Sequence, residues 1–140
     1  MYQRLIIVGN LGRDPEMRYL PNGSAVTNIN VASNRVYNDA NGQKVTETTW
    51  FRVSVWRAQA ESVNQYLRKG SKVLVEGYLN SDPETGGPRV FTRNDGSAGS
   101  SYEMTAQRVV FLSSRQEDQA FQSQDGGGFS EQVDEDDIPF

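Results

Sequence analysis

Two long extended stretches joined by a short loop constrain the fold of this chain more than any other feature. Residues 24–37 alternate between apolar and polar side chains, as in Asn28-Ile29-Asn30-Val31, and residues 44–56 form a second extended stretch. The loop between them, residues 38–42, ends in Asn-Gly, which has the turn chemistry of a β-hairpin. The two stretches are therefore predicted to pair as one long hairpin.

Shorter elements flank this hairpin on both sides. An apolar run at Leu5–Val8 predicts a strand that ends in a Gly-Asn-Leu-Gly turn. Residues 58–69 carry apolar side chains at helical spacing, which predicts the one helix, with Arg68 and Lys69 in its last turn and Gly70 at the C′ position.

Residues 72–79 and 102–112 are predicted to return to strand. Between them, a Gly- and Pro-punctuated excursion over residues 81–100 contains a short extended piece at Arg89–Arg93. The order is then three strands, one helix and two strands. That is the element order of the OB-fold, a five-stranded Greek-key barrel with a helix between its third and fourth strands, so an all-β domain with one helix is expected over residues 1–113.

Charge divides the chain into two unlike parts. Residues 1–115 carry all 14 Lys and Arg against ten Asp and Glu, a net charge of +4, whereas residues 116–140 carry eight acids and no base, a net charge of −8. The acidic overall balance therefore describes the C-terminal part, and the folded part is mildly basic. Residues 114–133 are Gln-, Ser- and Gly-rich and are expected to form a disordered linker.

The last seven residues combine four carboxylates with an apolar end. An acidic tail that only improves solubility has no reason to finish on Ile-Pro-Phe. A partner with an apolar pocket and a basic rim would bind such an end, so the segment is predicted to be a docking tip. Its residues are Asp134, Glu135, Asp136, Asp137, Ile138, Pro139 and Phe140.

The composition excludes several classes of function. The 140 residues contain no Cys and no His, which removes thiolate and imidazole metal sites, disulfides and His-activated nucleophiles. No catalytic residues, metal or cofactor are expected, and the acids of the tail lack the rigid geometry that Mg²⁺ needs. No apolar stretch is long enough to span a membrane. A cytoplasmic protein is therefore expected.

The strand around Trp50 carries the strongest functional signal. Alternation places Phe51, Val53 and Val55 on a core face, and Trp50, Arg52 and Trp56 on the opposite, polar face. Exposed tryptophans call for a flat ligand or another subunit to cover them, and nucleic-acid bases are flat ligands that stack on any aromatic ring. Burial in a second apolar layer or a subunit interface is the alternative interpretation.

Other aromatic and basic residues extend this face into a candidate track for a single strand. Tyr37 ends the opposed strand of the hairpin, and Phe91 lies in the later excursion. No arrangement of side chains suggests reading of base edges in a duplex groove. We therefore expect a single strand of nucleic acid to lie along the hairpin, with phosphates neutralised by Arg18, Arg35, Arg52, Arg68, Lys69 and Arg89.

Four segments resemble the bacterial single-stranded DNA-binding protein family. They are Val8–Gly23 (VGNLGRDPEMRYLPNG), Thr48–Val53 (TTWFRV), Tyr66–Leu79 (YLRKGSKVLVEGYL) and Asp136–Phe140 (DDIPF). The resemblance implies an OB-fold that assembles as a homotetramer, binds single-stranded DNA without sequence preference, and protects it during replication, repair and recombination. It also implies an association with the nucleoid, and docking of the tail to helicases, exonucleases, primase and recombination mediators.

The resemblance also assigns the stacking residues. The family's base-stacking aromatics correspond to Tyr37, Trp50 and Trp56, and a fourth platform corresponds to Phe91. The assignment of Phe91 depends on the placement of a gap, because the segment Asp82–Pro88 is additional to the family pattern. Three alternatives remain: an RNA-binding OB-fold protein, an enzyme, and an adaptor or specialised paralogue. Housekeeping, paralogous and phage-borne copies are not distinguished by these residues.

Overall fold

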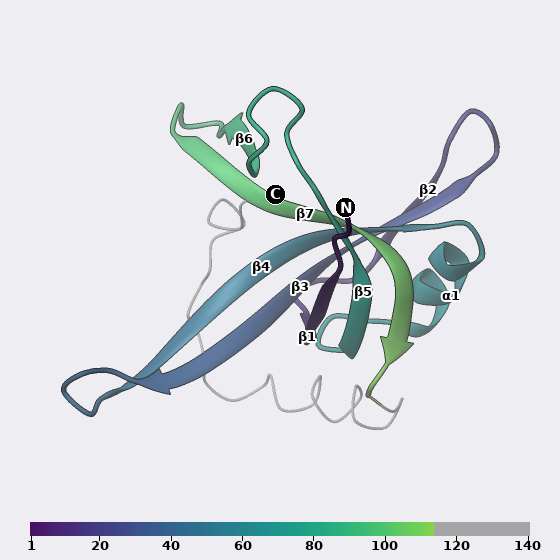
Figure 1. Cartoon of the computed structure of the whole chain (residues 1–140). Coiled ribbons are helices and arrows are strands. Elements are labelled where there is room, and N and C mark those ends of the chain that lie inside the picture. Colours follow the sequence, from purple (N-terminus) through teal and green to yellow (C-terminus); the bar gives the residue numbers. More distant parts are fainter. Residues whose placement is uncertain (114–140) are drawn as a thin grey trace.

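The predicted hairpin is the longest feature of the fold. In the computed structural model, which describes residues 1–113, β3 (Ala25–Asn38) and β4 (Lys44–Trp56) pair antiparallel from Val26 opposite Trp56 to Asn38 opposite Lys44. Asp39 Oδ1 accepts hydrogen bonds from two backbone N–H groups of the connecting turn, both at 2.9 Å. The distal half of the hairpin projects away from the rest of the molecule as a two-stranded arm (Figure 1).

Three further strands close a barrel on the proximal half of the hairpin. They are β1 (Leu5–Leu11), β5 (Lys72–Asn80) and β7 (Ala98–Phe111), and the strand order is β1-β5-β7-β4-β3. The barrel closes because the end of β1 returns to β3, with Asn10 opposite Ala32. Only β4 and β7 run parallel among these pairs. The five-stranded barrel with one helix that the sequence predicts is therefore confirmed.

Two short strands lie outside the barrel path. The predicted extended piece in the excursion forms β6 (Arg89–Thr92), which pairs with β7 as a second hairpin. The other, β2 (Glu16–Tyr19), pairs with β3 and was not predicted. Its four residues, Glu-Met-Arg-Tyr, alternate between polar and apolar side chains, but the run is too short to be distinguished from a loop between the Asp-Pro and Pro-Asn-Gly turn signals that flank it.

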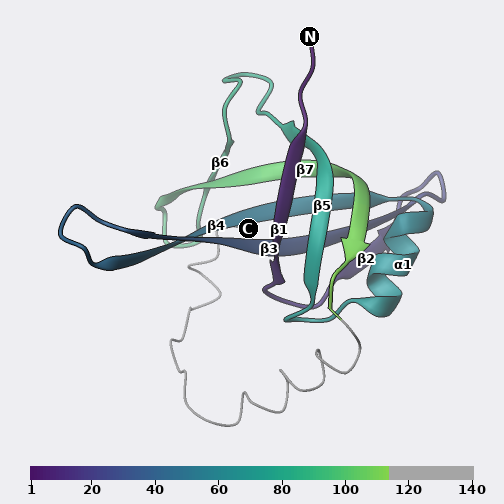
Figure 2. The same cartoon turned by 60° about the horizontal axis from the view of Figure 1, so that its bottom comes forward.

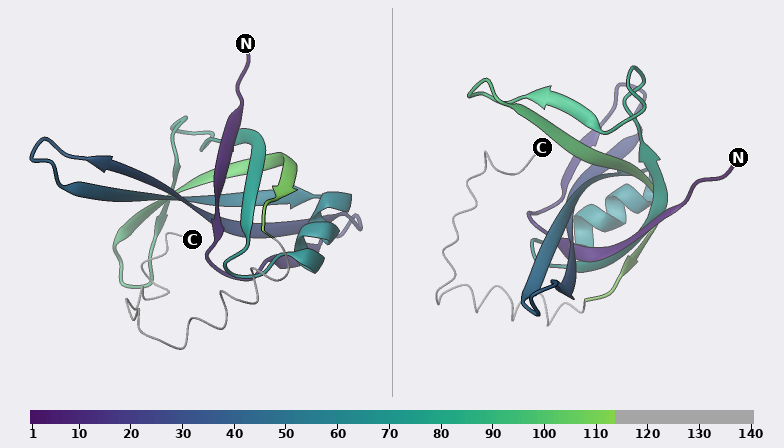
Figure 3. Two further views of the ribbon diagram at one scale, coloured as in Figure 1. Left: turned by 90° about the horizontal axis from the view of Figure 1, so that it is seen from below. Right: turned by 60° about the vertical axis from the view of Figure 1, so that its left-hand side comes forward.

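The core lies inside the barrel and beneath the helix. Strand residues that point inward are almost inaccessible to solvent, among them Ile29, Val31, Val53, Val55, Val73, Val75 and Met104. The helix α1 (Ala58–Tyr66) adds Val63 to this cluster, and Thr27 Oγ1 donates a hydrogen bond to the Ala60 carbonyl at 2.7 Å. Figures 2 and 3 show α1 at the end of the barrel away from the tip of the arm.

The helix is shorter than predicted, and Arg68 and Lys69 are not in its last turn. Leu67 adopts an extended conformation and ends the helix after Tyr66. Gly70 then occupies a separate turn at φ 90°, which the Ser71 N–H closes on the Arg68 carbonyl at 3.0 Å. The left-handed conformation that favours glycine at position 70 is therefore required by this turn and not by the end of the helix. Within residues 1–113, no helix is long and apolar enough to cross a membrane.

Candidate nucleic-acid interface

The outer face of β4 carries the two tryptophans and the arginine as the alternation predicts. Val53 and Val55 point into the core and are almost fully buried, so Trp50, Arg52 and Trp56 point outward. The Trp56 side chain is 40% exposed, and Trp50 is half-buried. The two tryptophans are six positions apart on the strand, which corresponds to about 20 Å along β4.

Trp56 ends a row of side chains that crosses three strands. Val26 on β3 lies opposite Trp56, and Arg18 on β2 lies opposite Val26. Val26 is only 1% exposed although it faces outward. Adjacent strands are about 4.8 Å apart, so the structure brings Arg18 to about 10 Å from Trp56, measured between backbones.

Trp50 lies against the loop that follows β1. A Cβ atom built on Gly12 would approach two carbons of the Trp50 ring, Cζ3 and Cη2, to 2.5 and 2.6 Å. A side chain at position 12 would thus displace the ring. The loop itself is fixed to β3, because the Gly12 N–H donates to the backbone carbonyl of Asn30 at 3.0 Å. The Trp50 ring therefore packs against loop backbone that is itself hydrogen-bonded to β3.

Arg13, which sequence reasoning missed, follows directly in this loop. With the Asn30 side-chain amide turned so that its oxygen faces Arg13, Oδ1 accepts hydrogen bonds from Nε at 2.7 Å and Nη2 at 3.0 Å. Asn30 is 2% exposed and lies opposite Arg52 on the outer face. No local signal in the sequence marked Arg13, because the burial of Asn30, whose amide needs a polar partner, follows from the tertiary structure.

The β6–β7 hairpin extends the outer face beyond β4. Glu103 on β7 lies opposite Arg52, and Ser101 and Gly99 share its side of the strand by alternation. Phe91 lies opposite Gly99, where a Cβ atom would meet the phenyl ring at 2.8 Å. The Phe91 ring thus occupies the space left by the missing side chain.

The cations of this hairpin already have partners. Arg89 pairs with Glu103 at 3.3 Å, and the Arg93 guanidinium carbon lies 5.8 Å from the centroid of the Phe91 ring. The segment before β6 forms an ordered loop, in which Asp82 Oδ1 accepts from the Glu84 N–H at 2.8 Å. The additional segment of this chain is therefore an ordered loop that leads into β6.

Tyr37 does not share a face with Trp50. In the register of the hairpin, Tyr37 lies opposite Val45 and Trp50 opposite Ala32, so the two rings leave opposite sides of the ribbon. The side that carries Tyr37 is the continuation of the core-facing side, exposed where the arm leaves the barrel. A DNA strand that stacks on both rings must follow the twist of the arm from one side to the other.

Glu47 binds both predicted site residues on the Tyr37 side of the arm. The Tyr37 hydroxyl donates to Glu47 Oε1 at 2.9 Å, and Arg35 Nη2 lies 3.0 Å from Glu47 Oε2. The Arg35 guanidinium carbon is also 4.8 Å from the centroid of the Tyr37 ring. The hydrogen bond to Glu47, with the negative charge of that carboxylate, raises the pKa of Tyr37, because ionisation would lose the bond and place two anions together. Tyr37 therefore stays neutral across physiological pH.

Arg68 and Lys69 lie in the turn after α1, beside the loop that supports Trp50. Arg68 Nη1 donates to the Leu67 carbonyl at 2.8 Å, and the Lys69 backbone N–H donates to Asp14 Oδ1 at 2.8 Å. Arg68 is thus partly committed to the end of the helix. The Lys69 ammonium group makes no hydrogen bond or ion pair with the residues that the structure describes.

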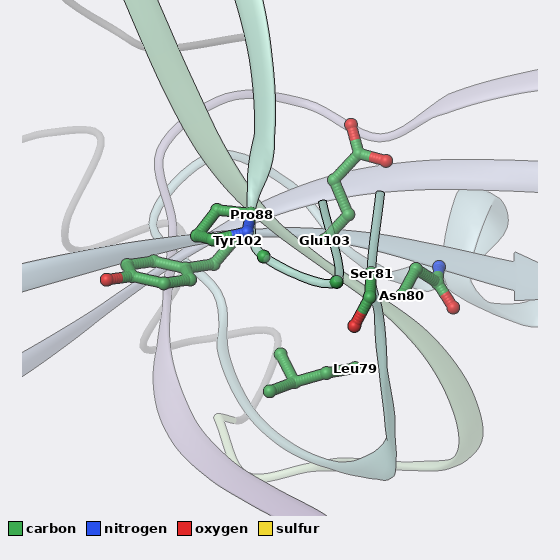
Figure 4. Close-up of a pocket in the computed structure, with 8 residues that line it drawn as sticks. Leu79, Asn80, Ser81, Pro88, Tyr102 and Glu103 are labelled. Carbon is green, nitrogen blue, oxygen red and sulfur yellow. The ribbon is translucent and has the colours of Figure 1, made fainter. Parts of the chain in front are cut away.

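A pocket of about 120 Å³ lies where the additional segment folds back on β7 (Figure 4). Leu79, Pro88 and Tyr102 provide its apolar walls. None of the predicted stacking residues lines it.

Within the described part of the chain, no three His, Cys, Asp or Glu side chains gather as a metal site. The predicted docking tip, residues 134–140, and the predicted linker lie outside the described residues.

Comparisons with known proteins agree on one family. The family model described as the Single-strand binding protein family matches residues 2–112. Single-stranded DNA-binding proteins of Neisseria meningitidis serogroup A and Helicobacter hepaticus are each 40% identical, over 81% and 82% of this chain. The chain spans only 62% and 64% of the length of these two relatives. A crystal structure of a deletion variant of the single-stranded DNA binding protein from Thermus aquaticus matches with a TM-score of 0.59 and 26% identity, over 80% of this chain and 51% of that one.

Proposed function

The chain belongs to the single-strand binding protein family, and from this premise we propose that it binds and protects single-stranded DNA without sequence preference. The observation that carries the proposal is the outer face of β4, where Trp50 and Trp56 flank Arg52 on a surface that is otherwise polar. Stacking on such rings is worth about 1–3 kcal/mol per base and tolerates any sequence.

Single-stranded DNA follows the outer face from Trp56 past Arg52 to Trp50 in this proposal. Arg18 supplies a cation beside Trp56, and Arg68 and Lys69 supply cations beside the loop under Trp50. Phe91 offers a further platform on the β6–β7 hairpin, and Tyr37 offers one on the other side of the arm. Phosphates must compete with Glu47 for Arg35 and with Glu103 for Arg89, because both arginines already form ion pairs.

Titration of intrinsic tryptophan fluorescence tests the proposal directly. The chain has two tryptophans, so the signal comes from the two proposed platforms alone. Oligo-dT is expected to quench the fluorescence strongly, and a duplex of equal length only weakly. The log–log salt slope should be about −0.7 per phosphate neutralised. Absence of quenching by oligo-dT would contradict the assignment, and tighter binding of oligo-U than of oligo-dT would point to RNA as the ligand.

Self-association is the second part of the proposal. The outer face of the β1–β5–β7 sheet carries an apolar row: Val8, Leu74 and Val110 lie side by side in register, and Ile6 lies beside them on β1. Ile6 and Val8 are 54% and 41% exposed. The other edge of β1, over residues 5–9, pairs with no strand among residues 1–113. A second copy that pairs along this edge would cover both features, as the first step towards a homotetramer.

A charge on this face is expected to break the assembly. The variant Val8→Asp places a carboxylate in the apolar row and should reduce the mass measured by light scattering from that of a tetramer to that of a smaller species. Lys44→Asp, on the arm, is the control and should leave the mass unchanged. Circular dichroism checks that both variants stay folded. A wild-type protein that is monomeric at micromolar concentration would contradict the proposed assembly.

Recruitment of replication, repair and recombination proteins by the C-terminal residues is the third part. The acidic and apolar residues of the tip support it, because a partner with a basic rim and an apolar pocket would bind them. The recruitment would take place in the cytoplasm, on the DNA of the nucleoid. Deletion of Asp134–Phe140 is expected to abolish capture of partner proteins while DNA binding is retained. Tighter DNA binding by the truncated protein at low salt is also expected, because the acids would no longer compete for the basic face. Equal capture by both proteins would exclude the tip as the docking segment.

A further inference from the structure

The Arg13 guanidinium is held by a neutral side chain rather than by a carboxylate. The ion pairs among residues 1–113 engage Arg4 with Glu76, Arg35 with Glu47 and Arg89 with Glu103. Arg13 forms none of them. Its guanidinium instead donates twice to the side-chain oxygen of Asn30, a neutral amide. The hydrogen bonds therefore orient the group without cancelling its charge.

Asn30 is itself held firmly, so the orientation of Arg13 is well determined. The Asn30 side chain is 2% exposed and lies in the central part of β3, paired with Arg52 on β4. Its backbone carbonyl also accepts the Gly12 N–H, which fixes the residue immediately before Arg13. One buried residue thus positions both the Arg13 side chain and the loop that carries it. A positively charged group fixed in advance loses little conformational freedom when an anion arrives.

The location of this group connects it to the proposed DNA path. Gly12, the neighbour of Arg13, lies directly against the ring of Trp50. Asn30 lies opposite Arg52, the residue between the two tryptophans. Arg13 itself is exposed, so an anion can reach the N–H groups that Asn30 leaves unused. Asn30, which holds the guanidinium, is two positions along β3 from Ala32, the residue opposite Trp50, so the guanidinium lies near the proposed base platform.

We propose that Arg13, oriented by Asn30, is a preorganised binding site for the phosphate of the nucleotide that stacks on Trp50. The proposal rests on the proposed function and goes beyond it by naming a phosphate contact and the residue that positions it. Asn30 is a positioning residue, since it acts through Arg13 and does not touch the DNA. Arg35 and Arg89 must first exchange a carboxylate for a phosphate, whereas Arg13 needs no exchange.

The test compares three single variants with the wild-type protein by fluorescence titration over a range of salt. Arg13→Gln is expected to make the log–log salt slope shallower by about 0.7, so its deficit in affinity grows about fivefold for each tenfold decrease in salt. Arg13→Lys keeps the charge but lacks the planar fork, so it should keep the slope and lose part of the affinity. Arg4→Gln removes the same charge from an ion-paired residue and should leave slope and affinity unchanged.

A second ligand separates this proposal from the proposed function. An abasic single strand of equal length retains the phosphates but offers no base to stack. Arg13→Gln should change the salt slope equally on oligo-dT and on the abasic strand. If wild-type protein binds oligo-dT but Arg13→Gln matches it in slope and affinity, the Arg13 site is overturned while the proposed function stands. If the wild-type protein binds neither strand, the proposed function itself fails.

Discussion

Replacing Trp56 by Ala is expected to weaken binding of oligo-dT by about 1–3 kcal/mol, and replacing Trp50 should have an effect of the same size. Each substitution removes one platform from the outer face of β4 and leaves the inward residues Val53 and Val55 in place. The rings are about 20 Å apart along the strand, so the two losses should add in the double variant to about 2–6 kcal/mol. Fluorescence anisotropy of a labelled oligo-dT measures all three, because the variants lose intrinsic signal.

A matched control distinguishes stacking from a general loss of aromatic surface. Tyr19 is a well-exposed aromatic on β2, and its side chain points to the opposite side of the strand from Arg18. Tyr19→Ala should therefore bind like the wild-type protein. Unchanged affinity in both single tryptophan variants would contradict the stacking mechanism, provided that their thermal unfolding midpoints match that of the wild-type protein.

The largest expected loss of stability comes from the barrel core. Ile29 is 1% exposed at the centre of β3, opposite Val53, and its replacement by Ala should lower the free energy of unfolding by about 2–5 kcal/mol. The cost combines lost apolar burial with a cavity that the closed barrel cannot readily collapse around. Guanidinium unfolding followed by circular dichroism measures this loss of stability, which appears as a lower midpoint concentration of guanidinium.

Val36→Ala, on the same strand, is the control for position. Val36 lies on the projecting arm and is 54% exposed, so its truncation should change the stability by no more than about 0.5 kcal/mol. A loss at Val36 as large as that at Ile29 would show that the arm is packed against another part of the protein, such as a second copy. Equal and small losses at both positions would contradict the assignment of the core.

Local sequence patterns predicted most of the barrel, because strand periodicity and turn chemistry are properties of neighbouring residues. The alternation in residues 24–37 and 44–56, with Asn-Gly between them, indicated both strands of the hairpin to within one residue at each end. The same approach failed where the pattern was short or ambiguous. It missed β2, and it extended the helix to Lys69 because a Gly suitable for a helix cap serves a separate turn.

The family resemblance identified more of the site than periodicity could. Trp50 and Trp56 follow from alternation on one strand, and the structure places both on the outer face. Tyr37 and Phe91 were candidates from their place among the basic residues, the resemblance assigned them as platforms, and their roles stay predictions. No local pattern contained the relative placement of these rings. The register of β3 and β4 puts Tyr37 on the opposite side of the arm from Trp50, and the pairing of β7 with β4 and β6 puts Phe91 on the same face as the tryptophans.

The sequence by itself determined the five strands of the barrel, the outward placement of the two tryptophans and the separation of a basic domain from an acidic C-terminal part. These depend on the order of residues along the chain, which alternation and composition report directly. The tertiary structure alone decided which cations keep their charge available. Arg35 and Arg89 meet carboxylates and Arg13 meets a neutral amide, because barrel closure and strand register bring together residues that lie 12 to 17 positions apart.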